Sequence, residues 1–463
     1  MQPLGPGFRF VDRQAEIRQA PSAPERLQIR VVDRFENVGD RPLRSIDGQF
    51  PSGSESGTEN LRVTIDGRSA LAQRIPGGDP RLIRAPFDPA WEQRQPREII
   101  TNWDFPAGLA DRGSVAASAV AFYLGGESVL PLWQPPHGIF VRGGPYPVQE
   151  DLTVFAPADF RVLASGKPLG QSAAGSLIGH RFRLRPREDF PPFVVAGRYQ
   201  EQEFRMPAGA VNFWTLHGLD PQQAERAAAR LGASVRAFDD YFGPSLKQKL
   251  LIHVVEAPVD LPAEFVAPEG PGGASFPNGV LLDPRAIAQG LASATVLELS
   301  EYELARTWFG WRLHPRPGAE LLMGRGARLF ALVVAAEARG QDERRRSVAL
   351  LLNRYDDSRR MAMDRALDEP PAGYSPAERL STGYRAALFF VALEDLCGRA
   401  NFRAALFDMI QAHSGDDVGM ADLRAAVEAA CHRDLSELFR AWMNHPGVPE
   451  DFRARYAEDR RGP

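Results

Sequence analysis

The stretch Thr295–Pro315 reads TVLELSEYELARTWFGWRLHP and is followed, after a Pro-Gly break, by Ala319–Phe330, AELLMGRGARLF. At the roughly 100° per residue of an α-helix, apolar residues of the first stretch fall on both sides of the helix, which predicts a buried helix. Glu303 and Arg306 lie within this buried pattern, where charged side chains are rare unless they are paired or serve a site. The first stretch therefore predicts a buried helix that carries a charged site.

The segment YELARTWFG (Tyr302–Gly310) resembles the HELAHQWFG helix of the zinc aminopeptidase family typified by aminopeptidase N. The later segment LMGRGARLF resembles that family's LNEGFAxY segment. In the family, two histidines one turn apart and a glutamate on the next helix hold zinc, and the glutamate beside the first histidine is the general base. The resemblance places Tyr302, Arg306 and Arg325 at the three ligand positions and leaves Glu303 as a vestigial general base. The interval between Arg306 and Arg325, 18 residues, also matches the family.

The three residues at the ligand positions have the wrong chemistry for zinc. Arginine has no lone pair to donate, and tyrosine is normally protonated near neutral pH. The eight histidines of the chain never fall at the short helical spacing that a zinc helix uses. We therefore expect no metal ligands, no zinc and no other cofactor.

Composition limits the class of protein. The chain has 463 residues, enough for two or three domains, and its 44% hydrophobic and 25% charged residues are ordinary for a soluble globular protein. The net charge of −4 argues against a nucleic-acid partner. No apolar stretch is long enough to span a membrane, and none after Met1 has the form of a signal peptide. Cys397 and Cys431 either pair in an oxidising compartment or are two buried thiols, and we favour the thiols.

A multidomain α+β fold is predicted, with an N-terminal β domain and a second domain that ends in a helical part. Short segments with period-two alternation, such as LQIRVVDRF and LRVTIDG, predict an N-terminal antiparallel β-sandwich or saddle domain over residues 1–203. Residues 204–380 read as a degenerate thermolysin-like α/β domain, because an amphipathic helical pattern over Pro221–Phe242 precedes the apolar strand KLLIHVVE. Residues 381–463 are predicted to be a helical C-terminal part of the same domain.

Two further segments resemble catalytic parts of the family. GGASF (Gly272–Phe276) falls where the family carries its GAMEN strand, whose glutamate binds the amino terminus of the substrate; Gly273 and Ala274 match, and Phe276 stands at the glutamate position. Taken alone, this segment also reads as a plain glycine-rich hairpin. The helix that contains STGYRAALFF resembles the family helix whose tyrosine stabilises the oxyanion, with Tyr384 one residue out of register.

Two functions remain open from the sequence. The favoured one is a catalytically inactive aminopeptidase-like protein of the gluzincin fold, a short bacterial-type member that binds a peptide, another ligand or a partner protein in the old cleft. The alternative is a hydrolase or metallopeptidase of the aminopeptidase N type with an atypical site. A periplasmic or secreted location with the signal removed is favoured over the cytoplasm. Loss of the metal also predicts that Arg306 or Arg325 pairs with Glu303, with the Tyr302 ring filling the vacated space.

Overall fold

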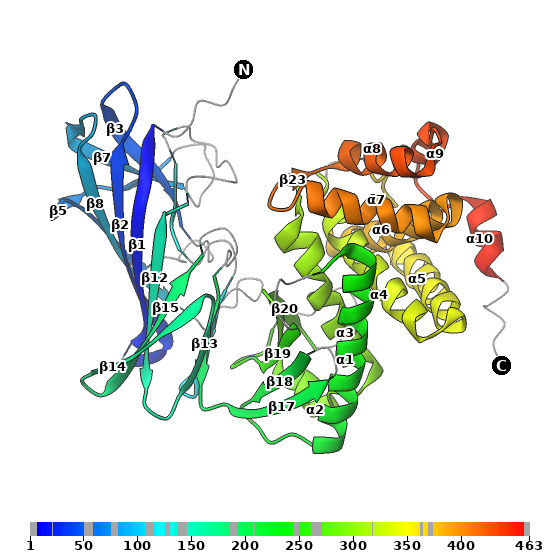
Figure 1. The fold of residues 1–463 in the computed structure, drawn as a ribbon, viewed down its shortest axis with the longest axis horizontal. Coiled ribbons are helices and arrows are strands. Elements are labelled where there is room, and N and C mark those ends of the chain that lie inside the picture. The colour runs from blue at the N-terminus through cyan, green and yellow to red at the C-terminus, as the bar shows by residue number, and fades with distance from the viewer. Residues whose placement is uncertain are drawn as a thin grey trace.

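The computed structural model consists of a β-rich N-terminal part and a second part in which a sheet is joined to a group of helices (Figure 1). This arrangement confirms the predicted multidomain α+β fold with a helical C-terminal end. The structure describes residues 7–20, 22–50, 59–75, 82–106, 115–125, 130–134, 136, 146–185, 192–206, 209–244, 250–261, 271–316, 318–361, 364–368 and 374–457.

Three sheets make up the N-terminal part. The largest has the strand order β14-β15-β12-β1-β2-β8-β4-β5, and two four-stranded sheets have the orders β13-β16-β10-β9 and β11-β3-β7-β6. Neighbouring strands of the largest sheet are antiparallel except β1 and β12, which are parallel. The strands are β1 (Phe8–Ala20), β2 (Ala23–Asn37), β3 (Leu43–Gln49), β4 (Glu59–Ile65), β5 (Arg68–Ala70), β6 (Gln73–Arg74), β7 (Leu82–Trp91), β8 (Pro96–Pro106), β9 (Val115–Ala117), β10 (Ala121–Leu124), β11 (Leu132–Gln134), β12 (Gln149–Pro157), β13 (Arg161–Ala164), β14 (Lys167–Ala174), β15 (Leu177–Leu184) and β16 (Val194–Gly197).

Alternation along the strands builds the core of this part. Leu27, Ile29 and Val31 of β2 are buried, whereas Arg30 between them is exposed, as the period-two pattern predicts. Burial of one face in this way fixes the register, because a slip of one residue would turn the apolar side chains to solvent.

A mixed five-stranded sheet begins the second part, in the order β17-β18-β19-β21-β20. Its strands are β17 (Gln200–Met206), β18 (Gly209–Thr215), β19 (Leu250–Glu256), β20 (Gly273–Phe276) and β21 (Gly279–Leu282). Helix α1 (Pro221–Phe242) contacts β17 and β18 and starts at Asp220, whose side chain accepts a hydrogen bond from the amide of Gln222. The amphipathic pattern predicted for this helix is reflected in its buried apolar face, which includes Ala224, Ala228, Leu231, Val235 and Phe238.

The helical part contains the two predicted helices, and they adjoin as expected, because α3 packs against α4. Each is interrupted by non-α turns, however: a 3₁₀ turn (η1) and a π turn (η2) follow α3, and a π turn (η3) precedes α4. The remaining elements are α2 (Pro284–Gln289), α3 (Ala294–Leu304), η1 (Ala305–Thr307), η2 (Trp308–Arg312), β22 (His314–Pro315), η3 (Glu320–Gly326), α4 (Ala327–Arg339), α5 (Gln341–Met361), α6 (Pro376–Cys397), α7 (Arg399–Ala412), β23 (Asp417–Val418), α8 (Met420–Cys431), α9 (Ser436–Met443) and α10 (Glu450–Ala457).

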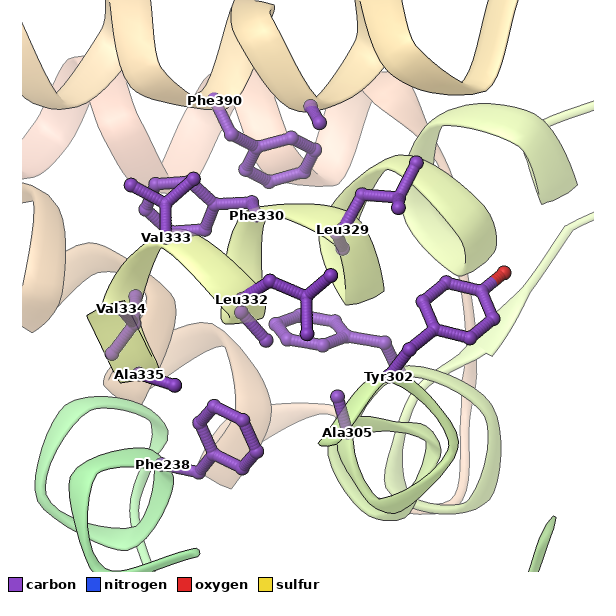
Figure 2. Packing of buried hydrophobic residues seen from close by; sticks show 14 of the residues in the cluster. Phe238, Tyr302, Ala305, Leu329, Phe330, Leu332, Val333, Val334, Ala335 and Phe390 are labelled. Atoms are coloured by element: carbon purple, nitrogen blue, oxygen red, sulfur yellow. The ribbon is translucent and has the colours of Figure 1, made fainter. Parts of the chain in front are cut away.

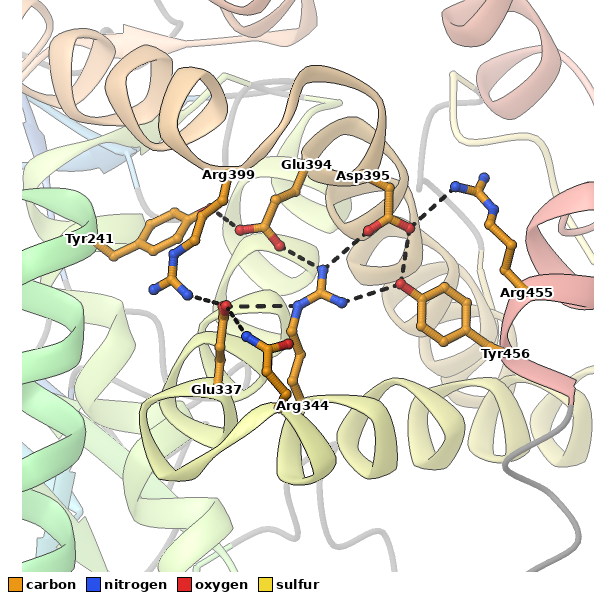
Figure 3. Close-up of polar contacts among 9 residues, drawn as sticks. Tyr241, Glu337, Arg344, Glu394, Asp395, Arg399, Arg455 and Tyr456 are labelled. Carbon is orange, nitrogen blue, oxygen red and sulfur yellow. Dashed lines mark hydrogen bonds and ion pairs between the residues drawn. The ribbon is translucent and has the colours of Figure 1, made fainter.

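A polar network holds α6 against its neighbours (Figure 3). Arg344 of α5 donates to Glu394 at 2.7 Å and to Asp395 at 3.2 Å, both on α6, and to the hydroxyl of Tyr456 on α10 at 3.2 Å. Tyr241 of α1 donates to the other oxygen of Glu394. Because each carboxylate is satisfied by more than one donor, the network fixes α6, which carries Tyr384.

The predicted division of the chain at residues 203 and 380 stays a prediction. Strand β17 runs across residue 203, and helix α6 runs across residue 380. Among the described residues, no helix has the length and apolar character that crossing a bilayer requires.

Cys397 and Cys431 form a disulfide, so the expectation of two buried thiols is wrong. Their Cα atoms are 5.2 Å apart, within the range that a disulfide needs, and both side chains are half-buried rather than buried. The bond joins the last residue of α6 to the last residue of α8. Sequence spacing alone gave no sign of this, since it depends on how the two helices pack.

Replacing both cysteines should destabilise the helical part. The disulfide closes a loop with a sequence separation of 34 residues. The entropy of such a loop in the unfolded chain predicts that Cys397→Ala/Cys431→Ala lowers the free energy of unfolding by about 2–4 kcal/mol. Urea unfolding followed by tryptophan fluorescence measures the loss. A reductant should lower the stability of the wild type and leave that of the double variant unchanged. If the reductant changes the stability of both proteins equally, the two cysteines are not bonded.

Candidate functional site

The candidate site is built on α3 and the turns that follow it. Ser293 caps this helix by accepting a hydrogen bond from the amide of Val296. Tyr302 and Glu303 lie in its last turn and are 0% and 1% exposed, as the apolar pattern on both sides predicts. The Tyr302 ring belongs to the hydrophobic cluster between α3, α4 and α6 that Figure 2 shows, so it fills space within the core.

The carboxylate of Glu303 is paired with Arg328 of α4. Its two oxygens lie 3.4 and 3.5 Å from Nη1 of that arginine, whose side chain is only 12% exposed. The same guanidinium stacks on Tyr302, with its central carbon 4.1 Å from the ring centroid. The sequence predicted Arg306 or Arg325 as the partner, and the structure shows Arg328 in that role. The Arg328 cation therefore balances the buried carboxylate and covers the tyrosine ring.

Arg306 lies on the turn after α3, and its side chain lies against Trp311. Its guanidinium carbon is 4.5 Å from the centroid of the Trp311 ring. Its stem passes over Gly310, where an added Cβ would be 2.5 Å from the Cγ of Arg306. The reason is local: η1 is a 3₁₀ turn, which advances more degrees per residue than an α-helix and so rotates Arg306 from the position that continued α-helix would give. The arginine thus stacks on an aromatic ring one turn later.

Arg325 lies within η3 and packs against α6. A Cβ at Gly383 would be 2.7 Å from the Cδ of Arg325, so this arginine needs a glycine at that helical position. Tyr384 follows in the same helix and is 3% exposed. Burial raises the pKa of Tyr384 to about 12, against the opposing influence of the nearby Arg354 and Arg325. Its phenol therefore keeps its proton at neutral pH.

The predicted strand residues Gly273, Ala274 and Phe276 lie on β20, at the edge of the five-stranded sheet. All three are buried. A Cβ on Gly273 would be 3.2 Å from Leu299, which places β20 directly against α3. The ring of Phe276 lies 4.3 Å from that of Phe193, in the N-terminal part. The residue at the expected amine-binding position is therefore part of an aromatic contact between the two parts of the chain.

Tyr123 of β10 also belongs to this site, and the sequence did not indicate it. Its ring lies 6.3 Å from that of Phe276. Burial raises the pKa of Tyr123, the charge of Arg306 lowers it, and the charge of Glu303 raises it. No sequence signal could have identified this residue, because its strand is distant in sequence from α3. Arg328, by contrast, was within reach of prediction, since it lies one helical turn beyond Arg325.

The structure thus brings Tyr302, Glu303, Arg306 and Arg325 together at one site, with Tyr384 beside Arg325 on one side. On the other side, β20 lies against α3 and carries Phe276 next to Tyr123. Tyr302 and Glu303 are buried, whereas Arg306 and Arg325 are half-buried. Nε and Nη1 of Arg325 are themselves buried.

The donor set at this site does not fit zinc. Of the three positions that the sequence resemblance assigns to zinc ligands, two carry guanidinium groups, which have no lone pair to give, and the third carries a tyrosine. Among the described residues, there is no group of three or more His, Cys, Asp or Glu side chains that could hold a metal ion. No catalytic step through a metal can therefore be derived from these residues.

Comparison with solved structures shows the fold. The M1 zinc metallopeptidase from Deinococcus radiodurans superposes with a TM-score of 0.66 at 16% sequence identity, covering 96% of this chain and 95% of that one. A point mutant of it gives a TM-score of 0.67 at 17% identity, with 96% of both chains covered. The same mutant, described as bound to a Tyr-Ser-Ala substrate, gives 0.66 at 16% identity. The sequence matches no protein-family model and no curated protein.

Removing the cation from the buried pair should be costly. We expect Arg328→Met to lower the free energy of unfolding by about 3–5 kcal/mol, because it leaves the carboxylate of Glu303 buried without its partner. The double variant Glu303→Gln/Arg328→Met should lose clearly less unfolding free energy than the two single variants lose together. Urea unfolding of the four proteins in this cycle measures the coupling.

The matched control is the pair Glu343 and Arg346 on the surface of α5, whose side chains are 41% and 69% exposed. There Arg346→Met should cost less than about 1 kcal/mol. If Arg328→Met lowers the free energy of unfolding no more than Arg346→Met does, the buried pair does not stabilise this site.

Proposed function

We propose that this protein is a catalytically inactive member of the aminopeptidase fold that uses the former active-site region to bind a peptide, another ligand or a partner protein. One observation carries the proposal: tyrosine and two arginines stand at the positions that the sequence resemblance assigns to the three zinc ligands, in a chain whose fold is similar to that of M1 zinc metallopeptidases. The fold supplies the comparison, and the chemistry of the side chains supplies the conclusion, because fold alone does not imply activity.

The remaining parts of the site support the same proposal. Glu303 is the one catalytic residue type that is retained, and its oxygens face Arg328 instead of a metal-bound water. Phe276 stands where an amine-binding glutamate is expected and packs against Phe193. A general base without its metal and an amine site without its carboxylate cannot carry out aminopeptidase chemistry.

A peptide is the ligand class that the fold suggests. The related mutant from Deinococcus radiodurans is described as bound to a Tyr-Ser-Ala substrate. For this chain, peptide binding is our proposal, and it would use different groups. The half-buried arginines Arg306 and Arg325 would replace the metal as the charged contacts.

We also propose that the protein is located in an oxidising compartment, such as the periplasm or the exterior of the cell. The disulfide between Cys397 and Cys431 supports this proposal, because such bonds persist in oxidising environments and are rare in the cytosol. Alkylation of thiols in intact cells before lysis tests it: cysteines that react without prior reduction would contradict the proposed location.

The purified protein should contain no stoichiometric zinc and should not hydrolyse aminoacyl p-nitroanilides above background. Elemental mass spectrometry measures the metal, and the release of p-nitroaniline with and without a chelator measures the activity. Turnover that a chelator abolishes would overturn the proposal in favour of a metallopeptidase with an atypical site.

The matched variant is Tyr302→His/Arg306→His/Arg325→Glu, which places imidazole and carboxylate ligands at the three positions. Zinc bound by this variant and not by the wild type would show that the chain lacks the ligands rather than the frame. Zinc bound equally by both proteins would contradict the assignment of these positions.

A further inference from the structure

We infer that His217 is a nucleophilic site whose imidazole accepts the acyl group of an activated ester. The inference goes beyond the proposed function and does not depend on it, because neither His217 nor its partner Glu256 belongs to the region built on α3. His217 lies two residues after strand β18, and Glu256 is the last residue of β19. These strands are parallel neighbours, so both residues lie at the carboxyl ends of the strands, where open α/β sheets place their ligand sites.

The pair joins an exposed ring to a fully buried carboxylate. Oε1 of Glu256 lies 2.5 Å from Nδ1 of His217, and the side chains of the glutamate and the histidine are 0% and 73% exposed. The other oxygen, Oε2, accepts hydrogen bonds from the backbone amides of Leu216 at 2.7 Å and of His217 at 3.2 Å. Both oxygens of the carboxylate are therefore fixed, and the carboxylate holds the imidazole in one orientation.

This geometry determines which nitrogen of the ring can react. A carboxylate oxygen at hydrogen-bond distance from Nδ1 accepts a proton from it, so Nδ1 carries the hydrogen of the neutral imidazole. The lone pair then lies on Nε2 of an exposed ring. A carboxylate that binds one nitrogen of an imidazole also makes the other nitrogen a stronger donor of its lone pair.

A role in folding alone does not account for the contact between the carboxylate and the ring. The two amide hydrogen bonds to Oε2 are sufficient to fix the loop after β18. A ring that is 73% exposed adds little to the core, yet the second oxygen of a buried carboxylate is directed at it. The arrangement therefore positions the imidazole itself.

The surroundings of the pair favour a neutral acyl compound over an anion. Leu216, Leu219 and Val259 lie on the loops that carry the pair, and all three are half-buried apolar side chains. Helix α1 begins nearby, but the carboxylate of Asp220 already accepts a hydrogen bond from the amide of Gln222 at its N-terminus. A phosphate would meet that negative charge, whereas an apolar acyl chain would contact the three side chains.

The acyl transfer has two steps. Nε2 of His217 attacks the carbonyl carbon of the ester, the bond from that carbon to the leaving oxygen breaks, and the Nδ1 proton passes to Glu256 as the N-acyl imidazole forms. Water then adds its hydroxyl to the acyl carbon, and the electrons of the carbon–nitrogen bond return to Nε2. Glu256 returns its proton to Nδ1, and the alkoxide or phenolate released first takes up the proton that the water loses.

The first test compares two histidines of the same molecule. Diethyl pyrocarbonate, a small acylating reagent, is added to the full-length wild type with a chelator present, and peptide mass spectrometry follows each histidine. His432, an exposed residue after α8 whose ring has no contact with another described residue, is the reference. At the alkaline plateau of the rate, His217 should be acylated about 10-fold faster than His432. Acylation of His217 at an equal or lower rate would overturn the inference.

The variant Glu256→Gln assigns the effect to the carboxylate. It keeps an oxygen that can accept from Nδ1 and removes the charge, so acylation of His217 should slow toward the rate of His432, and His432 itself should be unaffected. An unchanged rate at His217 would contradict the role of the carboxylate. If circular dichroism shows that this variant does not fold, the comparison of the two histidines in the wild type decides the question.

Turnover of an ester is the second readout. With the chelator present, so that no metal contributes, the wild type should release p-nitrophenolate from p-nitrophenyl butyrate about 10-fold faster than His217→Gln does. The matched control His432→Gln should retain the wild-type rate, and thermal midpoints verify that both variants are folded. Equal rates for the wild type and His217→Gln would show that the ring transfers no acyl group and would overturn the inference.

Discussion

A carboxylate in the interior of a protein has to be balanced by a cation, and the pair of Glu303 and Arg328 meets that requirement here. The pair joins α3 to α4, and the stacking of Arg328 on Tyr302 adds a third side chain to the same unit. A zinc enzyme would balance the charge of such a carboxylate with a metal dication. This chain balances it with the guanidinium of Arg328, a side chain of the protein itself. The pair therefore links the two helices through side chains of the protein itself.

Much of this arrangement followed from the sequence, because the signals are local. The apolar pattern on both sides of Thr295–Pro315 predicted the burial of Tyr302 and Glu303, and the spacing to Arg325 predicted the adjoining second helix. The partner of Glu303 was not predicted, because it depends on the point at which α3 changes into a 3₁₀ turn, and that change rotates Arg306 toward Trp311. Contacts between distant segments, such as Tyr123 with Phe276 or Cys397 with Cys431, leave no periodic signal that a single sequence could display.

This chain shares its fold with solved zinc metallopeptidases at 16–17% sequence identity over 96% of the chain. Such divergence is compatible with one architecture because a core needs suitable volume and polarity pattern more than particular residues. Catalytic sites have no such tolerance, since a zinc ligand must supply a lone pair at a fixed point. Core residues can therefore change while the fold is kept, whereas a zinc ligand cannot be replaced without loss of the metal. Similarity of fold gives no information about whether the ligands are kept.

Gly383 and Arg325 place a constraint on how this chain can change over evolutionary time. As long as the arginine passes beside α6, a larger residue at 383 meets its Cδ, so the glycine cannot be replaced first. If a shorter side chain replaces Arg325, position 383 no longer has to leave space for it. Alanine at position 383 would then stabilise the helix more than glycine does. The two positions should therefore vary together among close homologues, with glycine at 383 accompanying arginine at 325, so that lineages which kept this side chain could be distinguished by their sequences alone.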